Sequence, residues 1–277
     1  MEIKELTIII TTFKSEEKIR PCLNSIPKSI RTIIVENSDN KLFKQEIESE
    51  YSNVECLLTG DNKGYAVANN LGLSKVTTKY ALVLNPDTII GKNSIENFIS
   101  SAETHQDFWL MGPVNSQYKK YDQSSEKLIE VENLKGFAIF LNMKKFDRKF
   151  FDENFFLYFE EIDLCKKVRI QKGKIFLHPK IIIRHEGASS VKKFNLDELE
   201  KNRNWHWMWS TFYFHKKYKG FIIAFVLILP KLISSFLKII FYFFLKNKKK
   251  RDIYFYRLNG IINSILGKKS WYRPTFH

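Results

Sequence analysis

Acidic side chains gather in one aromatic segment of the chain, residues 151–165. Within it Glu160 and Glu161 are adjacent, and Asp163 follows two positions later, in front of an amphipathic helical pattern that continues to Arg169. A helix dipole favours carboxylates in the first helical turn, which is the purely structural interpretation. The aromatic neighbours also make the surroundings partly apolar, and such surroundings tune a carboxylate towards the strength of a general base. We therefore predict that at least one of the three carboxylates removes a proton during catalysis.

A further carboxylate, Asp87, follows the apolar run 81–84 and the turn residues Asn85 and Pro86. A buried strand would deliver this carboxylate to the edge of a sheet, with Asn85 as a neutral oxygen donor. Mg²⁺ binds through one or two carboxylates together with substrate phosphates, so the turn is a candidate hard-cation site. An ordinary Pro-Asp turn has the same sequence. His185 ends another apolar run, and an isolated histidine at a strand end is more often structural than a ligand.

Short β-branched runs alternate with helical patterns through the first hundred residues, which is typical of βαβ units and a parallel sheet. We predict a Rossmann-like open α/β sheet that binds its ligand beyond the carboxyl ends of the strands. Shorter apolar runs from about residue 105 onward indicate a second, mixed half of the same domain, and the polar stretch 115–133 is predicted to be a loop that faces a substrate or partner. The predicted strands are 6–11, 32–36, 54–58, 80–84, 109–111, 137–141, 175–178 and 181–185, and the predicted helices are 15–26, 42–51 and 65–73.

The charge of the chain is unevenly distributed. Of the net +15 carried by the 277 residues, residues 1–189 contribute +1 and residues 190–277 contribute +14. This asymmetry excludes a uniformly basic nucleic-acid coat and predicts a globular domain at 1–190 followed by a basic, aromatic helical region at 191–277. The three cysteines are scattered and no export signal is visible, so we expect a cytoplasmic, reducing location.

The region 221–245 is long enough to span a membrane and carries two charges in 25 positions. Pro230 interrupts it, and Lys231, Ser234, Ser235 and Lys238 recur at helical spacing to form one polar stripe. That pattern favours an amphipathic helix lying in the membrane interface, with its lysines towards the headgroups. A membrane span and a packed helical lid are the alternatives.

Aromatic and basic groups flank this region on both sides. Trp205, Trp207, Trp209 and Tyr213 precede it and are predicted to form an interfacial belt. The basic cluster 246–251 follows it and suits anionic headgroups. The many apolar neighbours argue against nucleic acid as the partner of this cluster.

Six segments occur in order along residues 5–190, namely 7–13, 33–38, 62–72, 84–88, 151–165 and 185–190. Together they resemble the family 2 glycosyltransferases of the GT-A type, particularly the bacterial rhamnosyltransferase-like branch that builds surface polysaccharides. The resemblance implies a mixed GT-A sheet flanked by helices. It also implies a divalent cation, Mg²⁺ or Mn²⁺, that holds the diphosphate of a sugar nucleotide.

The resemblance assigns roles to individual residues. Asp87 would ligate the cation and His185 would complete the metal or diphosphate site. Glu161 stands where the family more usually has an aspartate as base, so Glu160 and Asp163 remain alternatives. The resemblance places Thr11, Thr12 and Glu36 at the nucleoside, Gly64 and Asn70 at the ribose and diphosphate, and Asn62 and Asn85 among the donor-binding residues.

The function implied is inverting, metal-dependent transfer of a sugar from a dTDP-sugar, dTDP-rhamnose for example, or a UDP-sugar. The acceptor would be a saccharide or a polyprenyl-linked saccharide at the cytoplasmic face of the cell membrane. A sugar nucleotidyltransferase is one alternative, although residues 12–15 would make a poor phosphate loop. A catalytically inactive scaffold at the membrane is another, because Asn85 replaces the first carboxylate of the expected metal motif and Glu161 replaces the usual aspartate.

Overall fold

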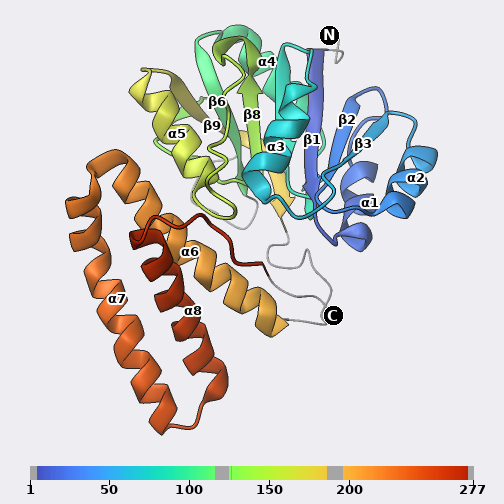
Figure 1. The fold of residues 1–277 in the computed structure, drawn as a ribbon. Helices are drawn as coiled ribbons and strands as arrows, with labels where there is room; N and C mark the ends of the chain where they lie inside the picture. The colour runs from blue at the N-terminus through green and yellow to red at the C-terminus, as the bar shows by residue number, and fades with distance from the viewer. Residues whose placement is uncertain (1–4, 116–124, 126, 186–195, 274–277) are drawn as a thin grey trace. The chain divides into compact units, whose positions relative to one another are not determined.

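The computed structural model describes residues 5–115, 125, 127–185 and 196–273, with the side chains of Asn115 and Leu196 left out. The chain forms two compact units (Figure 1). One consists of Met1–Asp152 and Glu161–Lys192 and is called the sheet domain below. The other consists of Glu153–Glu160 and Lys193–His277 and is called the helical unit.

The sheet domain is built on one mixed sheet with the strand order β3-β2-β1-β4-β8-β6-β9-β5, and β7 pairs with β9. Strands β3, β2, β1 and β4 are parallel, whereas β8 runs antiparallel to both β4 and β6. The predicted mixed α/β sheet flanked by helices is therefore confirmed. The strands are β1 Leu6–Thr12, β2 Arg31–Glu36, β3 Val54–Leu58, β4 Tyr80–Leu84, β5 Thr88–Ile90, β6 Phe108–Asn115, β7 Ile129–Glu130, β8 Ala138–Asn142 and β9 Lys174–His185.

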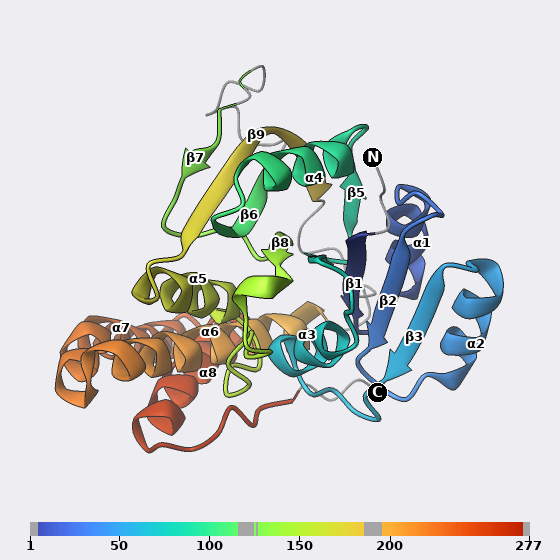
Figure 2. The ribbon, with the colours of Figure 1, turned by 90° about the horizontal axis from the view of Figure 1, so that it is seen from above.

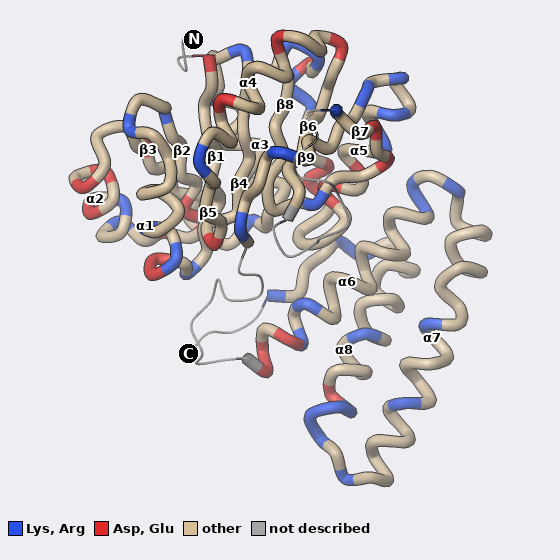
Figure 3. The backbone as a smooth tube through the Cα atoms, turned by 180° about the vertical axis from the view of Figure 1, so that it is seen from behind, with Lys and Arg blue, Asp and Glu red and all other residues tan. Residues whose placement is uncertain are grey.

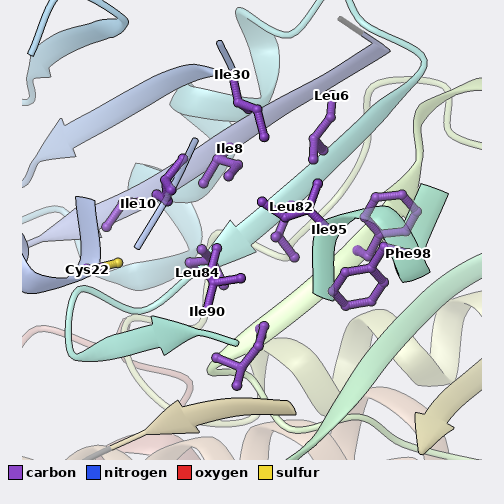
Figure 4. Packing of buried hydrophobic residues seen from close by; sticks show 14 of the residues in the cluster. Leu6, Ile8, Ile10, Cys22, Ile30, Leu82, Leu84, Ile90, Ile95 and Phe98 are labelled. Carbon is purple, nitrogen blue, oxygen red and sulfur yellow. The ribbon is translucent and has the colours of Figure 1, made fainter. Parts of the chain in front are cut away.

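Helices cover both faces of this sheet (Figure 2). Successive side chains of a strand point to opposite faces, so Ile8 and Ile10 of β1 pack with α1, α2 and α4 (Figure 4), whereas Ile9 packs with α3 and α5. Gly72 of α3 allows the close approach, because a Cβ there would lie 2.6 Å from Cγ2 of Ile9. The helices are α1 Glu16–Asn24, α2 Lys41–Glu50, α3 Tyr65–Ser74, α4 Ser94–Thr104 and α5 Glu160–Ile170.

The second half of the sheet differs from the sequence prediction in three places. The runs 175–178 and 181–185 belong to one long strand, β9, which passes through Pro179 at a register shift against β6. Strand β5 and helix α4 were not predicted. The polar stretch 115–133 contains the short strand β7, and residues 116–124 and 126 of it lie outside the described part of the chain.

The helical unit consists of α6 Leu196–Lys219, α7 Phe221–Phe244 and α8 Lys248–Ile265. Its small core contains Met208 and Phe212 of α6, Ala224 and Ile228 of α7, and Ile261 of α8. Helix α7 continues through Pro230 without ending. Pro230 thus interrupts the run of apolar residues but not the helix.

The prediction of an interfacial tryptophan belt is wrong for Trp205 and Trp209. Trp205 is fully buried and donates its indole N–H to Oδ1 of Asn259 at 2.8 Å. Trp209 is also buried and donates to the carbonyl of Lys268 at 3.0 Å. These rings pack inside the helical unit, and only Trp207 of the three, at 43% exposure, lies largely at its surface.

Helix α7 leaves most of its apolar side chains exposed. Ile222 and Phe244 are 78% and 76% exposed, and only Ala224, Ile228 and Ser235 of the helix are buried. By length and composition α7 is the one helix in the described residues that could cross a membrane. Lysines and arginines lie along α7 and α8, with several at the turn between them (Figure 3).

Candidate active site

Asp87 and His185 are brought together by pairing between distant strands. The turn after β4 ends in Asp87, and the next residue, Thr88, begins β5 and pairs with His185 at the end of antiparallel β9. Nε2 of His185 lies 3.2 Å from Oδ1 of Asp87 and 3.3 Å from Nδ2 of Asn85. The imidazole stacks on Phe137, with 5.0 Å between ring centroids. These contacts place three predicted site residues in one cluster.

Glu161 lies beside the loop that leads to this cluster. Its Cβ, Cγ and Cδ atoms would each be 3.5 Å from a Cβ built at Gly136, the residue next to Phe137. The phenol of Tyr65, at the start of α3, donates a hydrogen bond of 2.8 Å to the carbonyl of Gly136 and holds this loop. A side chain at Gly136 would therefore lie directly against the side chain of Glu161.

The carboxyl of Glu161 has the electrostatic character of a base. Removal from water raises its pKa above the ordinary value. Hydrogen bonds from backbone N–H groups of the first turn of α5 and the charge of Lys135 oppose this shift in part. A carboxylate with a raised pKa holds a proton more tightly, which is what general-base catalysis requires.

The other two candidate bases lie on a different face of α5. Glu160 and Asp163 are three residues apart, so they share one side of the helix. Glu160 is 3% exposed and Asp163 is fully buried, with Lys167 Nζ 3.8 Å from Oδ2 of Asp163. Glu161 is half-buried and is therefore the most accessible carboxylate of the three.

Two threonines end strand β1 at the edge where a ligand is expected. Thr11 and Thr12 are buried, and their hydroxyl groups have no hydrogen-bond partner among the described residues. A buried polar group without a partner is costly, and such groups are uncommon in folded proteins. The two hydroxyls are thus free to bond a ligand at this edge.

Glu36 ends the neighbouring strand β2 and is 2% exposed. Its carboxylate accepts hydrogen bonds from the backbone N–H and the hydroxyl of Ser38 and from the N–H of Asn40, at 2.7 to 3.2 Å. It therefore shapes the loop that follows β2. Its predicted contact with a nucleoside remains a prediction.

The predicted donor residues Asn62 and Gly64 belong to a loop held by Asn37. The Asn37 amide donates to Oδ1 of Asn62 and to the carbonyl of Gly64, both at 3.2 Å. Its oxygen accepts from the N–H of Lys63 at 3.0 Å and from the hydroxyl of Thr59 at 3.1 Å. Gly64 has φ of 88° and begins α3, a conformation that favours glycine. The sequence places Asn37 directly after a predicted strand and within the segment 33–38, but it assigned no role to this residue.

The predicted donor residue Asn70 contacts the aromatic segment. Its amide nitrogen donates to the carbonyl of Phe151 at 2.9 Å, and its oxygen accepts from the N–H of Phe151 at 3.0 Å. Both ends of the amide hold the backbone of the aromatic segment. A contact of Asn70 with ribose remains a prediction.

The donor set at the cluster suits a divalent cation whose remaining ligands come from a diphosphate. Asp87 offers a carboxylate oxygen and His185 an imidazole nitrogen, and Mg²⁺ and Mn²⁺ accept such ligands. The Asp87 side chain is 3% exposed and that of His185 22%, so the pair is nearly shielded from water. Within the described residues, no group of three or more His, Cys, Asp or Glu side chains forms a metal cluster. A cation at Asp87 and His185 would take further ligands from outside this pair, such as the oxygens of a bound diphosphate.

The signals for the missed residues were weak. Phe137 and Gly136 precede β8, and only their three-dimensional neighbours reveal that one stacks on His185 and the other borders Glu161. Residues 186–190, the rest of the last segment that carries the resemblance, lie outside the described residues.

Comparison with known proteins gives one family and a consistent set of relatives. Residues 7–165 match the family described as Glycosyl transferase family 2. The low-salt glycan biosynthesis hexosyltransferase Agl10 of Haloferax volcanii is 24% identical over 194 residues, which cover 60% of this chain and 62% of the relative. Glycosyltransferase GlyA of Streptococcus pneumoniae is 26% identical over 161 residues, covering 49% of this chain and 23% of the relative. The chain thus spans less than two thirds of the length of these curated relatives.

Solved structures share the fold at low sequence identity. The mannosyltransferase PcManGT from Pyrobaculum calidifontis, in complex with GDP-Man and Mn²⁺, has a TM-score of 0.61 and 10% identity, with 96% of this chain and 88% of that chain covered. Residues 1–349 of TarS from S. aureus, in complex with UDP-GlcNAc, have a TM-score of 0.53 and 15% identity, with 97% and 93% covered.

Proposed function

Since this chain belongs to glycosyl transferase family 2, we propose that it transfers a sugar from a nucleoside diphosphate sugar to an acceptor hydroxyl with inversion at the anomeric carbon. The observation that carries the proposal is the Asp87–His185 contact at the sheet edge, with Glu161 beside the loop that holds Phe137 against His185. The cluster can hold the leaving diphosphate, and the carboxylate can accept the proton.

The reaction proceeds by a single displacement. Glu161 removes the proton of the acceptor hydroxyl, and the oxygen forms a bond to the anomeric carbon. The bond between that carbon and the diphosphate oxygen breaks, and the nucleoside diphosphate leaves with the bonding electrons. A divalent cation held by Asp87 and His185 would neutralise charge on the leaving diphosphate. Because attack and departure occur on opposite faces of the sugar, the configuration inverts.

The donor proposed is a dTDP-sugar, dTDP-rhamnose for example, or a UDP-sugar, bound along the ends of β1 and β2. The unpartnered hydroxyls of Thr11 and Thr12 and the carboxylate of Glu36 lie at these ends. The loop around Asn62 and Gly64, fixed by Asn37, follows the adjacent strand β3. Two relatives are named for glycan biosynthesis and for teichoic acid polymerisation, which supports a saccharide or polyprenyl-linked acceptor in the synthesis of a surface polysaccharide.

The helical unit supports a location at the cytoplasmic face of the cell membrane. The exposed apolar side chains of α7 and the basic turn between α7 and α8 fit a helix lying in the interface of an anionic membrane. We assign this unit to peripheral, in-plane association. Flotation of the full chain with phosphatidylglycerol vesicles tests it, and failure to float would contradict it.

Nucleotide binding tests the donor site. The melting temperature of the protein is measured with dTDP, UDP and GDP, each with and without Mn²⁺ or Mg²⁺. We expect one pyrimidine nucleotide to raise it in a metal-dependent way, because ligands that bind only the native state stabilise it. Asp87→Ala should remove the metal-dependent part of the shift. The matched control is Asp107→Ala, which removes an exposed carboxylate paired with Lys174 in the same domain. A metal-dependent shift that survives in Asp87→Ala would refute the site, and folded wild-type protein without any shift would favour the inactive scaffold.

A further inference from the structure

Two hollows adjoin each other on the helical unit. The first has a volume of about 180 Å³, lies between α7 and α8, and includes Lys231, Lys238, Tyr254 and Arg257 in its lining. The second is a groove of about 510 Å³ along α7, lined chiefly by the apolar residues Leu229, Pro230, Ile233 and Leu237. Pro230, Ser234 and Lys238 line both, so a basic pocket opens directly onto an apolar groove.

Three cations line the basic pocket, and within the part of the chain that the structure describes no carboxylate pairs with them. Among the described residues, no ion pair involves Lys231, Lys238 or Arg257. The acidic side chains of α6 and α8 are engaged elsewhere. Asp197 and Glu200 contact Lys249, Glu198 contacts Lys201, and Asp252 contacts Arg251.

Two of the three cations, Lys238 and Arg257, lie against one aromatic side chain, Tyr254. Lys238 donates to the hydroxyl of Tyr254 at 3.2 Å and lies 4.8 Å from the centre of its ring, and the Arg257 guanidinium lies 5.5 Å from the same ring. Nε of Arg257 is buried and has no hydrogen-bond partner among the described residues. Partial burial, together with the charge of Arg257, lowers the pKa of Lys231 below its ordinary value. The pocket therefore concentrates positive charge and keeps donor capacity for an anion.

The groove extends the pocket with an apolar surface. Ile233 and Leu237 are apolar residues of α7, and yet their exposed fractions are 47% and 57%. A free phosphate would use the pocket alone. A molecule with a phosphate and a hydrocarbon chain would use both hollows, because the chain removes the groove from water while the cations bind the phosphate.

We propose that this pocket binds the phosphate of an anionic membrane phospholipid whose acyl chain lies along the groove of α7. The proposal rests on the membrane association proposed above and adds a discrete, saturable site to it. Non-specific attraction of lysines to an anionic surface needs no such site, since it follows from net charge alone. The site would fix the rotation of α7 about its axis relative to the membrane plane.

A short-chain lipid tests the pocket without a bilayer. Dihexanoylphosphatidylglycerol, added to the full chain below its micelle concentration, should raise the melting temperature saturably. Inorganic phosphate should bind at least tenfold more weakly, because it leaves the groove exposed. Lys231→Gln with Arg257→Gln should weaken binding of this lipid about tenfold or more, and Ile233→Ser with Leu237→Ser should bring its affinity down to that of inorganic phosphate.

The control removes two charges outside the pocket. Lys268→Gln with Lys269→Gln replaces two exposed lysines of the same unit and should leave the affinity for the short-chain lipid unchanged. Equal losses in the control and pocket variants would overturn the proposal in favour of non-specific attraction. Tighter binding of farnesyl phosphate than of the short-chain lipid would overturn the choice of phospholipid.

The two proposals fail in different ways. Wild-type protein that does not float with phosphatidylglycerol vesicles contradicts the membrane association itself. Wild-type protein that floats but shows no saturable shift with the short-chain lipid contradicts the pocket alone. Nucleotide-induced shifts, measured on the same preparations, report the donor site separately.

Discussion

The sheet domain and the helical unit differ in how much apolar surface they expose, because most of the exposed large apolar side chains lie in the helical unit. The sheet domain buries charged and polar groups, with Asp87 at 6% and Glu36 at 2% exposure, behind a core of aliphatic side chains. The helical unit exposes aliphatic and aromatic side chains, with Ile222 at 78%. Burying polar groups costs free energy, as does exposing apolar ones to water. In the sheet domain, protein groups offset part of this cost, as Ser38 and Asn40 do at Glu36, whereas most of α7 stays exposed.

The two units mark their functional groups by different features. In the sheet domain the informative groups are the buried polar atoms that lack partners or have raised pKa values, such as the hydroxyl of Thr11 and the carboxyl of Glu161. In the helical unit the informative feature is the apolar face that nothing in the described residues covers. A substitution at the buried polar groups of the sheet domain should leave the function of the helical unit intact. A substitution on the apolar face should likewise leave the function of the sheet domain intact.

Removing the charge of Glu161 should cause the strongest loss of catalytic activity. Glu161→Gln should lower turnover about 10²- to 10⁴-fold, the usual contribution of a positioned general base. Donor affinity measured by calorimetry should stay nearly the same, because the amide keeps the size of the side chain. Turnover is measured with the sugar nucleotide identified by the thermal-shift screen and a soluble saccharide acceptor.

The matched control is Glu132→Gln, since Glu132 is an exposed glutamate of the same domain that pairs with Arg169 at 3.4 Å. Its turnover should match that of the wild type. Full activity in Glu161→Gln would eliminate Glu161 as the base and return Glu160 and Asp163 to consideration. It would also mean that a half-buried charged group of the sheet domain contributes only to stability or packing. Buried polar groups would then no longer indicate function in this unit.

A pair of glycine substitutions should destabilise the two units separately. In Gly72→Ala the new Cβ would meet side-chain atoms, Cγ2 of Ile9 at 2.6 Å and Cγ2 of Val35 at 3.1 Å, which can shift at a cost of about 1 to 3 kcal/mol. In Gly260→Ala the Cβ would overlap the backbone carbonyl of Trp205, so α6 and α8 would have to separate. We expect the second substitution to cost more than the first.

Urea unfolding with two probes separates these effects. Four of the five tryptophans belong to the helical unit, so tryptophan fluorescence reports mainly that unit. Nucleotide binding reports the sheet domain. Gly260→Ala should shift the fluorescence transition and spare the nucleotide-induced shift, and Gly72→Ala should do the opposite. If both probes move together in both variants, the two units unfold as one.

Local periodicity sufficed to predict the parallel half of the sheet. Strands β1 to β4 and helices α1 to α3 were predicted within a few residues, because each is a short apolar run or an amphipathic segment bounded by turn residues. The second half depends on contacts between distant segments. Strand β5 has three residues, and its existence follows from pairing with β9 rather than from its own composition.

The candidate site shows the same limit. The sequence marked Asp87 and His185 separately, and the resemblance to a family joined them, but their 3.2 Å contact depends on the antiparallel pairing of β5 with β9. No pattern in the sequence predicts that Phe137 stacks on His185. In the helical unit, Trp205 and Trp209 were misassigned because a tryptophan on a helix can face lipid or a neighbouring helix, and composition alone cannot distinguish the two.

The weakest effect should be on stability as a function of pH. It measures how much the burial of the Glu161 carboxyl destabilises the fold, apart from the role of Glu161 in catalysis. Burial raises the pKa of this carboxyl above the ordinary value of 4.5. Between pH 4.5 and the raised pKa, the folded state therefore binds more protons than the unfolded state, and stability falls as the pH rises through this window. At neutral pH the ionised carboxylate destabilises the fold, so Glu161→Gln should be more stable than the wild type there.

Below pH 4.5 Glu161 is protonated in both the folded and the unfolded state, and the neutral acid resembles the amide. The stability difference between Glu161→Gln and wild type should then shrink towards zero, as measured by urea unfolding across this range of pH. In the wild type, the acid limb of kcat/KM should fall at a pH above 4.5, because the base must be ionised to accept a proton. A variant less stable than the wild type at neutral pH would show that the folded state favours the ionised carboxylate. That result would refute the raised pKa of Glu161. It would also refute the conclusion that the ionised carboxylate destabilises the folded state.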